Sequence, residues 1–228
     1  MKKIVGMLCL LGAASLTRAA LIADWNFNGG TVSNPTIADH GSGSLSLSGL
    51  ANSSDASIIS SGTSVNEVSG DLAGKALSIQ AGGSGEPENG KSLIFSISTS
   101  GYQNIVLTYA TEATSSGFTD QQWSYSTDGT LYISFGSAIT IAQSSTFSGN
   151  GTETVDFSSA TAVNNDATVY FELTLSGATG TSGADHFDNF QINAVPEPAA
   201  SGAISGLGLL GICGNRIWRQ QRAPKIPV

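Results

Sequence analysis

The segment 168–175, Thr-Val-Tyr-Phe-Glu-Leu-Thr-Leu, decides the fold class. Its apolar side chains recur at every second position, as Val169, Phe171, Leu173 and Leu175. The positions between them carry hydroxyl groups or a carboxylate. Because successive side chains of a β-strand point to opposite faces, this alternation predicts a strand with one face in a core and the other toward solvent.

The same two-residue period recurs along the chain and predicts about ten short strands. They lie at 23–27, 45–47, 77–79, 93–97, 105–109, 123–125, 131–135, 139–141, 155–157, 169–175 and 187–192. The Asp128-Gly129 pair between two alternating runs is typical of a β-hairpin. No segment between the two ends carries an apolar stripe of helical period. The sequence therefore predicts an all-β fold, an antiparallel, jelly-roll-like β-sandwich over 20–194 whose first and last strands pair.

Composition and charge narrow the classes of function. The chain has 228 residues with 28 glycines, and 11% of its residues are charged. Between Asp24 and Asp188, sixteen acidic residues face only two basic ones, Lys75 and Lys91. Nucleic-acid binding needs a basic surface, so this acidic middle excludes nucleic acid as an expected partner.

The first 19 residues have the anatomy of an export signal. Lys2 and Lys3 precede an apolar run that ends at Leu16, and small residues flank a cleavage position after Ala19. The run is too short to span a bilayer, so we expect a cleaved signal peptide over 1–19. Both cysteines, Cys9 and Cys213, lie outside 20–194, and we expect no disulfide in the exported domain.

The C-terminal end has three consecutive parts. Pro196-Glu197-Pro198 follows the last predicted strand, an apolar Gly/Ala/Leu-rich run covers 199–213, and a basic group follows, formed by Arg216, Arg219 and Arg222. A proline break, an apolar helix and a positive stop predict a single transmembrane helix with its arginines on the cytoplasmic side. A plain membrane anchor is one reading of this order.

The order of these parts also resembles the PEP-CTERM sorting signal of exported bacterial proteins, over 195–222, with a tail at 223–228. The resemblance implies that an exosortase recognises Pro196, Glu197 and Pro198 and removes the helix. It implies that Arg216, Arg219 and Arg222 act as the membrane stop, and that the protein is anchored in the inner membrane before processing. The released product then belongs to the cell surface or the extracellular matrix of bacteria that make exopolysaccharide.

The sequence contains few side chains that are suited to catalysis. The only histidines are His40 and His186, and no cysteine lies in the exported domain. No segment resembles the nucleophile elbow of a serine hydrolase. A glycosidase needs two facing carboxylates, which sequence alone cannot pair. We expect no catalytic residues and no enzyme, with a polysaccharide-active enzyme as the remaining alternative.

Among the acidic residues, Asp188 is the one whose surroundings the sequence predicts in most detail. In the alternation of Asp188, Phe190 and Ile192 it shares a face with apolar residues, so its carboxylate needs a hydrogen-bonding or cationic partner. One hypothesis is a structural Ca²⁺ held by Asp188 and Asp24, and the other is that backbone N–H groups satisfy Asp188. Without that ion we expect no cofactor or metal. For His186 we expect a hydrogen bond before Phe187 rather than a metal.

The function expected from these features is that of an exported structural or adhesion protein, associated with exopolysaccharide or biofilm at the cell surface. The Trp-x-Tyr-Ser-x-Asp-Gly hairpin, which begins at Trp123, looks like one that recurs in jelly-roll carbohydrate-binding and adhesion modules. The alternative is therefore a carbohydrate-binding module in which exposed Trp123, Tyr125 or Tyr132 stacks on sugar rings. For these aromatic side chains, core packing is the competing expectation.

Overall fold

The computed structural model of the chain describes residues 18–33, 35–82 and 87–198. Over these residues it contains thirteen β-strands and four single-turn 3₁₀-helices, with no α-helix. Most of the expected signal peptide, the expected transmembrane helix and Arg216, Arg219 and Arg222 lie outside the described residues. Within the described ranges, no helix is long and apolar enough to cross a membrane.

The first of two sheets has seven strands, and the long strand β13 runs through its centre. Its path is β11 (Thr152–Asp156), β8 (Tyr102–Ala113), β13 (Ala184–Pro196), β1 (Ala20–Trp25) and β3 (His40–Gly41), and β6 (Ala76–Gln80) with β5 (Ala56–Ile59) joins β13 beside this path. β13 pairs with β8 along one side. On its other side it pairs first with β6 and then with β1.

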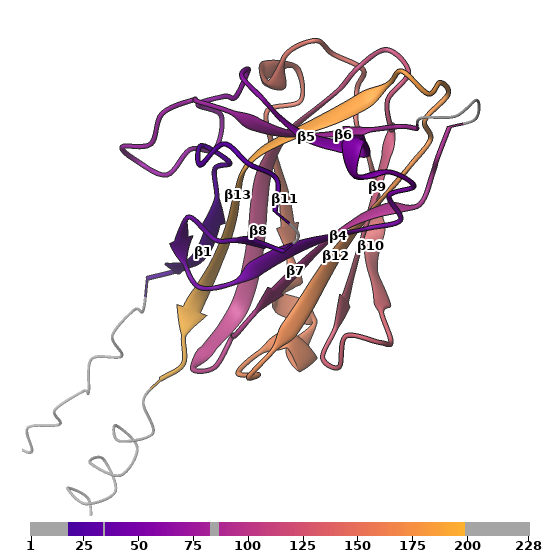
Figure 1. Cartoon of the computed structure of the whole chain (residues 1–228). Coiled ribbons are helices and arrows are strands. Elements are labelled where there is room, and N and C mark those ends of the chain that lie inside the picture. Colours follow the sequence, from indigo (N-terminus) through magenta and orange to yellow (C-terminus); the bar gives the residue numbers. More distant parts are fainter. Residues whose placement is uncertain (1–17, 34, 83–86, 199–228) are drawn as a thin grey trace, which may run out of the picture.

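The second sheet has six strands and faces the first (Figure 1). Its order is β10 (Ile133–Thr140), β9 (Asp120–Ser126), β12 (Val169–Ser176), β7 (Lys91–Ile97), β4 (Ser44–Ser48) and β2 (Thr36–Ile37). Every pairing between these strands, and between those of the first sheet, is antiparallel. The predicted antiparallel β-sandwich is thus confirmed.

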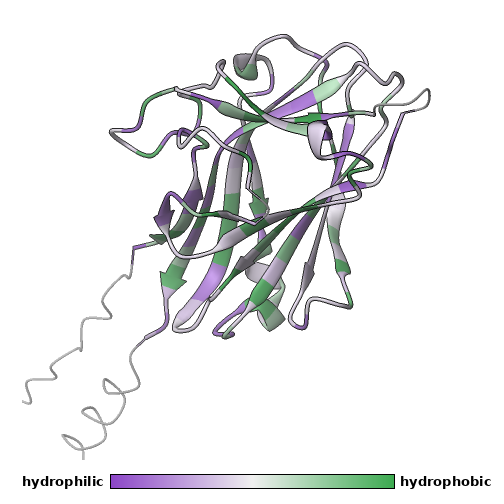
Figure 2. Cartoon of the chain, viewed as in Figure 1, coloured by the Kyte–Doolittle hydropathy of each residue, from purple (hydrophilic) through white to green (hydrophobic). Residues whose placement is uncertain are grey.

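The alternation that predicted the strands is the pattern that fills the core. In β12 the residues Val169, Phe171, Leu173 and Leu175 are all buried, and the residues between them are half-buried. Figure 2 shows hydrophobic and polar residues interspersed along the strands of both sheets. The apolar faces meet in one core between the sheets, where Trp25, Phe95, Tyr109 and Phe190 are in ring contact.

Several details of the predicted strands are wrong. β1 ends at Trp25, before Phe27, and β11 ends at Asp156, before Phe157. The segment 139–141 is not a separate strand, because Ile139 and Thr140 continue β10 past an irregularity in its pairing with β9. Leu131 lies outside β10 and is exposed. The hairpin itself is confirmed, but its connection spans 127–132, where the Asp128 side chain accepts hydrogen bonds from the backbone N–H groups of Thr130 and Leu131.

A β-bulge in β13 corrects the predicted face of Asp188. The pairing register between β13 and β8 shifts between Asp188 and Gln191, and Asn189 has a positive φ of 50°. Asparagine tolerates this left-handed conformation better than most residues. The extra residue puts Phe187 and Phe190 on the same core face. Asp188 therefore does not share a face with Phe190, as the simple alternation predicted, and instead contacts the segment after β5.

The first and last strands pair side by side, as predicted. Ala20 lies opposite Ala194, and Trp25 lies opposite Phe190. β1 therefore begins where β13 ends, at the same end of the sandwich (Figure 1). The other end of β1 reaches the acidic cluster described next.

Candidate functional site

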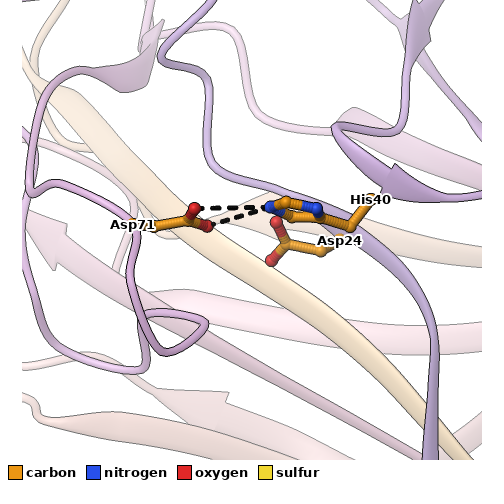
Figure 3. A group of neighbouring side chains, drawn as sticks. All are labelled: Asp24, His40 and Asp71. Carbon is orange, nitrogen blue, oxygen red and sulfur yellow. Dashed lines mark hydrogen bonds and ion pairs between the residues drawn. The ribbon is translucent and has the colours of Figure 1, made fainter.

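Three side chains from three separate segments form an acidic cluster, Asp24, His40 and Asp71 (Figure 3). Asp24 lies on β1 and His40 lies directly opposite it on β3. Gly41 permits this pairing, because its φ is 76° and a side-chain carbon there would lie 2.1 Å from the carbonyl oxygen of Ile22. The glycine after His40 thus lets β3 approach β1 closely enough to bring the imidazole to Asp24.

Asp71 comes from the long connection between β5 and β6, and asparagine side chains hold this connection in place. The Asn26 amide donates to Asp71 Oδ2 at 3.1 Å, and the Asn28 amide donates to the carbonyl of Leu72 at 2.9 Å. A third asparagine, Asn189 on β13, acts on the same connection, because its Nδ2 donates to the carbonyls of Thr63 and Val65. The bulge residue therefore fixes the start of the same connection that delivers Asp71.

The cluster runs from the interior to the surface. Asp24 is 0% exposed, the Asp71 side chain is 18% exposed and the His40 side chain is 46% exposed. His40 Nε2 lies 3.3 Å from Asp71 Oδ2, whereas neither carboxylate oxygen of Asp24 has a hydrogen-bond partner among the described residues. Burial raises the pKa of Asp24 to about 7 against the opposing effect of His40, and the nearby carboxylates of Asp71 and Asp39 raise it further.

A pocket of about 530 Å³ adjoins this cluster and shares Asp71 with it. Its lining carries two amides, a carboxylate and an ammonium group, supplied by Asn26, Asn28, Asp71 and Lys75. Leu72 also lines it and is 77% exposed. The pocket therefore offers hydrogen-bond donors and acceptors to a polar ligand.

The two candidate partners of the hypothetical Ca²⁺ site have different surroundings. Asp188 Oδ2 accepts a hydrogen bond from Thr63 N–H at 2.8 Å, and Oδ1 accepts one from Asn189 N–H at 2.9 Å. These are the backbone hydrogen bonds that the second hypothesis for Asp188 required. Burial nevertheless raises the pKa of Asp188 to about 8. The Asp24 carboxylate has no such bonds within the described ranges, and its neighbours in the cluster are His40 and Asp71.

His186 makes the kind of contact expected of it, with a partner on the neighbouring strand. Its Nδ1 lies 2.6 Å from Glu112 Oε1, and the two residues are register partners in β13 and β8. His186 lies within β13 rather than before it. Among the described residues it joins no group of metal-binding side chains.

The aromatic side chains considered for sugar stacking lie mostly in the core. Trp123 is buried, and its indole N–H donates to the hydroxyl of Tyr109 at 3.3 Å. Tyr125 and Tyr132 are half-buried. Tyr125 packs against Phe135 and Phe157. Core packing is therefore confirmed for Trp123, which cannot present its ring to a sugar.

The predicted sorting residues lie at the end of the last strand. Pro196 is the final residue of β13 and pairs with Tyr102. The backbone N–H of Glu197 donates to the carbonyl of Gly101 at 2.8 Å, and Pro198 is the last described residue at this end. The motif therefore starts where the sheet ends.

His40 and Asp71 were not predicted as site residues from the sequence. They lie 16 and 47 positions after Asp24, and no spacing motif joins them. The only local signal was an acid placed inside an apolar strand, Ala23-Asp24-Trp25, where all three side chains are buried. That signal identifies Asp24 alone and leaves its neighbours undetermined.

A second buried acid, Asp185, yields a prediction for the pH dependence of stability. Its carboxylate accepts hydrogen bonds from Phe118 N–H at 2.9 Å and from the Gln121 amide at 3.3 Å. Burial outweighs both bonds and raises its pKa to about 8. Tyr109, linked to it through Gln121, stays protonated, because burial raises the tyrosine pKa also.

Unfolding returns Asp185 to an ordinary pKa near 3.9, so between pH 4 and 8 the folded state holds the proton more tightly. The free energy of unfolding should therefore fall as pH rises through this range, by up to about 1.4 kcal/mol per pH unit for one such group. Asp185→Asn should reduce the slope measured by urea denaturation at pH 5, 6, 7 and 8 by the share of one group, because Asp24 and Asp188 also have raised pKa values. An unchanged slope in the variant would contradict the assignment.

Comparison with known proteins found similar structures but no similar sequence family. No family model matches the sequence, and no curated protein matches it. Among solved structures, the chain is similar to TmCBM61 in complex with β-1,4-galactotriose, with 11% identity over 75% of this chain and 94% of that one, at a TM-score of 0.44.

Two further structures are similar at the same level. One is the N-terminal CBM22-1–CBM22-2 tandem domain of Paenibacillus barcinonensis Xyn10C, with 12% identity, 81% of this chain and 49% of that one covered, and a TM-score of 0.47. The other is the K1 cleaved adhesin domain of Lys-gingipain from Porphyromonas gingivalis W83, with 10% identity, 79% and 99% covered, and a TM-score of 0.41. At these identities the likeness concerns the fold alone.

Proposed function

We propose that this chain is an exported protein, sorted by an exosortase, that serves as a structural or adhesion component of the cell surface or extracellular matrix. The observation that carries the proposal is the junction between β13 and the Pro-Glu-Pro motif. Pro196 still pairs within the sheet, and the Glu197 N–H makes the last backbone hydrogen bond among the described residues of this end. Cleavage beside the motif would leave every strand in place.

The other terminus supports the same proposal. Ala20, the first residue after the expected signal peptide, is the first residue of β1 and lies opposite Ala194. Removal of 1–19 would therefore leave every strand of the described residues in place. A body processed at both ends keeps the complete sandwich, as an exported and sorted protein requires.

The geometry of the acidic cluster favours a non-catalytic role. The ligand atoms of Asp24, His40 and Asp71 all lie within 4.8 Å of one another. A glycosidase needs two carboxyl groups that flank the scissile bond of the sugar. Asp24 is also fully buried, so it cannot face a sugar across a groove. The proposed partners are the exosortase, the membrane during sorting, and exopolysaccharide.

A second candidate function, a carbohydrate-binding module, is favoured by the polar pocket beside Asp71. Its amides and charged groups suit the hydroxyls of a sugar. Stacking on an aromatic platform is not favoured, since no aromatic side chain is highly exposed among the described residues. Glycan-array binding that is lost in Asn28→Ala would support the module. An absence of binding to any glycan would leave the structural role.

The sorting proposal predicts two new chain ends in the native host. Mass spectrometry of the intact protein should find an N-terminus near Ala20 and a C-terminus near Pro196. Glu197→Ala should retain the C-terminal segment, because it alters the proposed recognition motif while keeping the backbone N–H that pairs with Gly101.

Glu67→Gln is the matched control, because it changes an acid remote from the motif and should be processed normally. A wild-type chain that still ends at Val228 would contradict sorting and support the plain anchor. A reporter fused to 20–194 that stays in the cytosol would contradict export itself.

A further inference from the structure

The unpartnered carboxylate of Asp24 is the starting point for a new inference. The side chain is fully buried, and both of its oxygens lack a hydrogen-bond partner among the described residues. A buried charge without a partner is strongly unfavourable, so a native protein pairs it, protonates it or coordinates it to a cation. Figure 3 shows this carboxylate beside the His40 ring, on the side to which Asp71 also points.

The neighbouring groups are placed as the ligands of one ion would be. A divalent transition metal binds nitrogen and oxygen ligands at about 2.0–2.2 Å, so two ligands of one ion lie at most about 4.4 Å apart. The three ligand atoms here lie within 4.8 Å of one another, a spread that small side-chain rotations close. We infer that Asp24, His40 and Asp71 bind one divalent transition-metal cation of the zinc class.

The imidazole distinguishes this inference from the Ca²⁺ hypothesis. Ca²⁺ takes six to eight oxygen ligands, whereas imidazole with carboxylates suits zinc and its neighbours in the first transition row. The nearby carboxylates of Asp39 and Asp188 do not join the group of described side chains whose ligand atoms lie within 4.8 Å of one another. The cluster therefore offers three protein ligands, too few for a calcium site.

The surroundings have two other features of a metal site. The Asn26 amide donates to Asp71 Oδ2, so one ligand is oriented by an outer hydrogen bond. His40 is nearly half exposed, which leaves a path for an ion from solvent down to Asp24. A bound cation would join β1, β3 and the connection between β5 and β6, and would stand on the wall of the pocket that Asp71 lines.

The test is a metal titration of the purified full chain after treatment with a chelator. Calorimetry with Zn²⁺ should show one equivalent bound, and the melting temperature should rise with Zn²⁺ but not with Ca²⁺ or Mg²⁺. Co²⁺ at the same site should give the visible absorption of a nitrogen- and oxygen-ligated ion. His40→Ala should weaken Zn²⁺ binding by more than the about 10–100-fold that loss of an outer partner costs.

Asp24→Asn separates a ligand from a merely structural residue. It removes an unpartnered buried charge, so it should raise the melting temperature of the metal-free protein while abolishing the response to Zn²⁺. Glu67→Gln, a charge-matched change on the connection that carries Asp71, should behave as wild type. Zn²⁺ binding that survives both Asp24→Asn and His40→Ala would overturn the assignment, as would stabilisation by Ca²⁺ alone.

Discussion

Lys91→Met is expected to lower the free energy of unfolding by about 3–5 kcal/mol, the usual cost of breaking a buried ion pair from one side. The Lys91 side chain is 1% exposed and its ammonium has three partners. Asp55 lies 3.0 Å away, Glu88 lies 2.9 Å away and the carbonyl of Gln80 accepts at 2.9 Å. The ammonium therefore donates hydrogen bonds to Asp55 and to the Gln80 carbonyl, and Glu88 adds an ion pair.

The loss of stability in Lys91→Met comes from Asp55, the acidic residue that remains buried. Burial opposes ionisation of Asp55, but the hydrogen bond from Asn52 and the pairing with Lys91 outweigh it and lower its pKa. Without the lysine, a buried carboxylate loses its cation. Since small domains are stable by about 5–15 kcal/mol, the loss is a large part of the total.

Urea denaturation of three variants measures this effect. Lys75→Met removes the other lysine of the domain, which makes no ion pair among the described residues, and should stay within about 1 kcal/mol of wild type. Lys91→Met with Asp55→Asn should recover much of the loss, because it also removes the most deeply buried carboxylate of the pair, while the Glu88 side chain is 22% exposed. A single Lys91→Met variant as stable as wild type would show that the ion pair is energetically neutral.

The strands could be predicted from the sequence because their physical cause is local. A strand with one buried face must alternate apolar and polar residues, and β12 does so over its whole length. β5 was not predicted, because the prediction depends on that alternation. Its residues Ala56–Ile59 end in two consecutive isoleucines, so the alternation is weak. The two-residue strands β2 and β3 are too short to show any period.

The acidic cluster could not be predicted because its cause is not local. The position of His40 depends on a close approach between β3 and β1 at Gly41, and that of Asp71 depends on hydrogen bonds from Asn26 and Asn28. The bulge at Asn189 adds one residue to β13 and changes which side chains after it face the core. None of these events leaves a period or a motif, so only the folded arrangement brings the three ligands together.

Phe190→Ala should produce the second large loss, about 3–5 kcal/mol for a fully buried phenylalanine. Phe190 is 0% exposed and its ring contacts four others. Phe95, at 4.7 Å between ring centroids, lies on the opposite sheet, and Tyr109 stacks on it at 5.0 Å from the same sheet. The ring therefore links the two layers at the point where β13 leaves its bulge and pairs with β1.

The size of this loss should depend on volume rather than on aromaticity. Phe190→Leu keeps most of the buried apolar volume and should cost less than half as much as Phe190→Ala, whereas Leu131→Ala, at an exposed position, should change stability by less than about 0.5 kcal/mol. Urea denaturation with an unchanged m-value checks all three. If Phe190→Ala were no worse than Leu131→Ala, the two sheets would not depend on this contact. In that case the bulge at Asn189, which brings Phe187 and Phe190 to one face, would need a reason other than core packing.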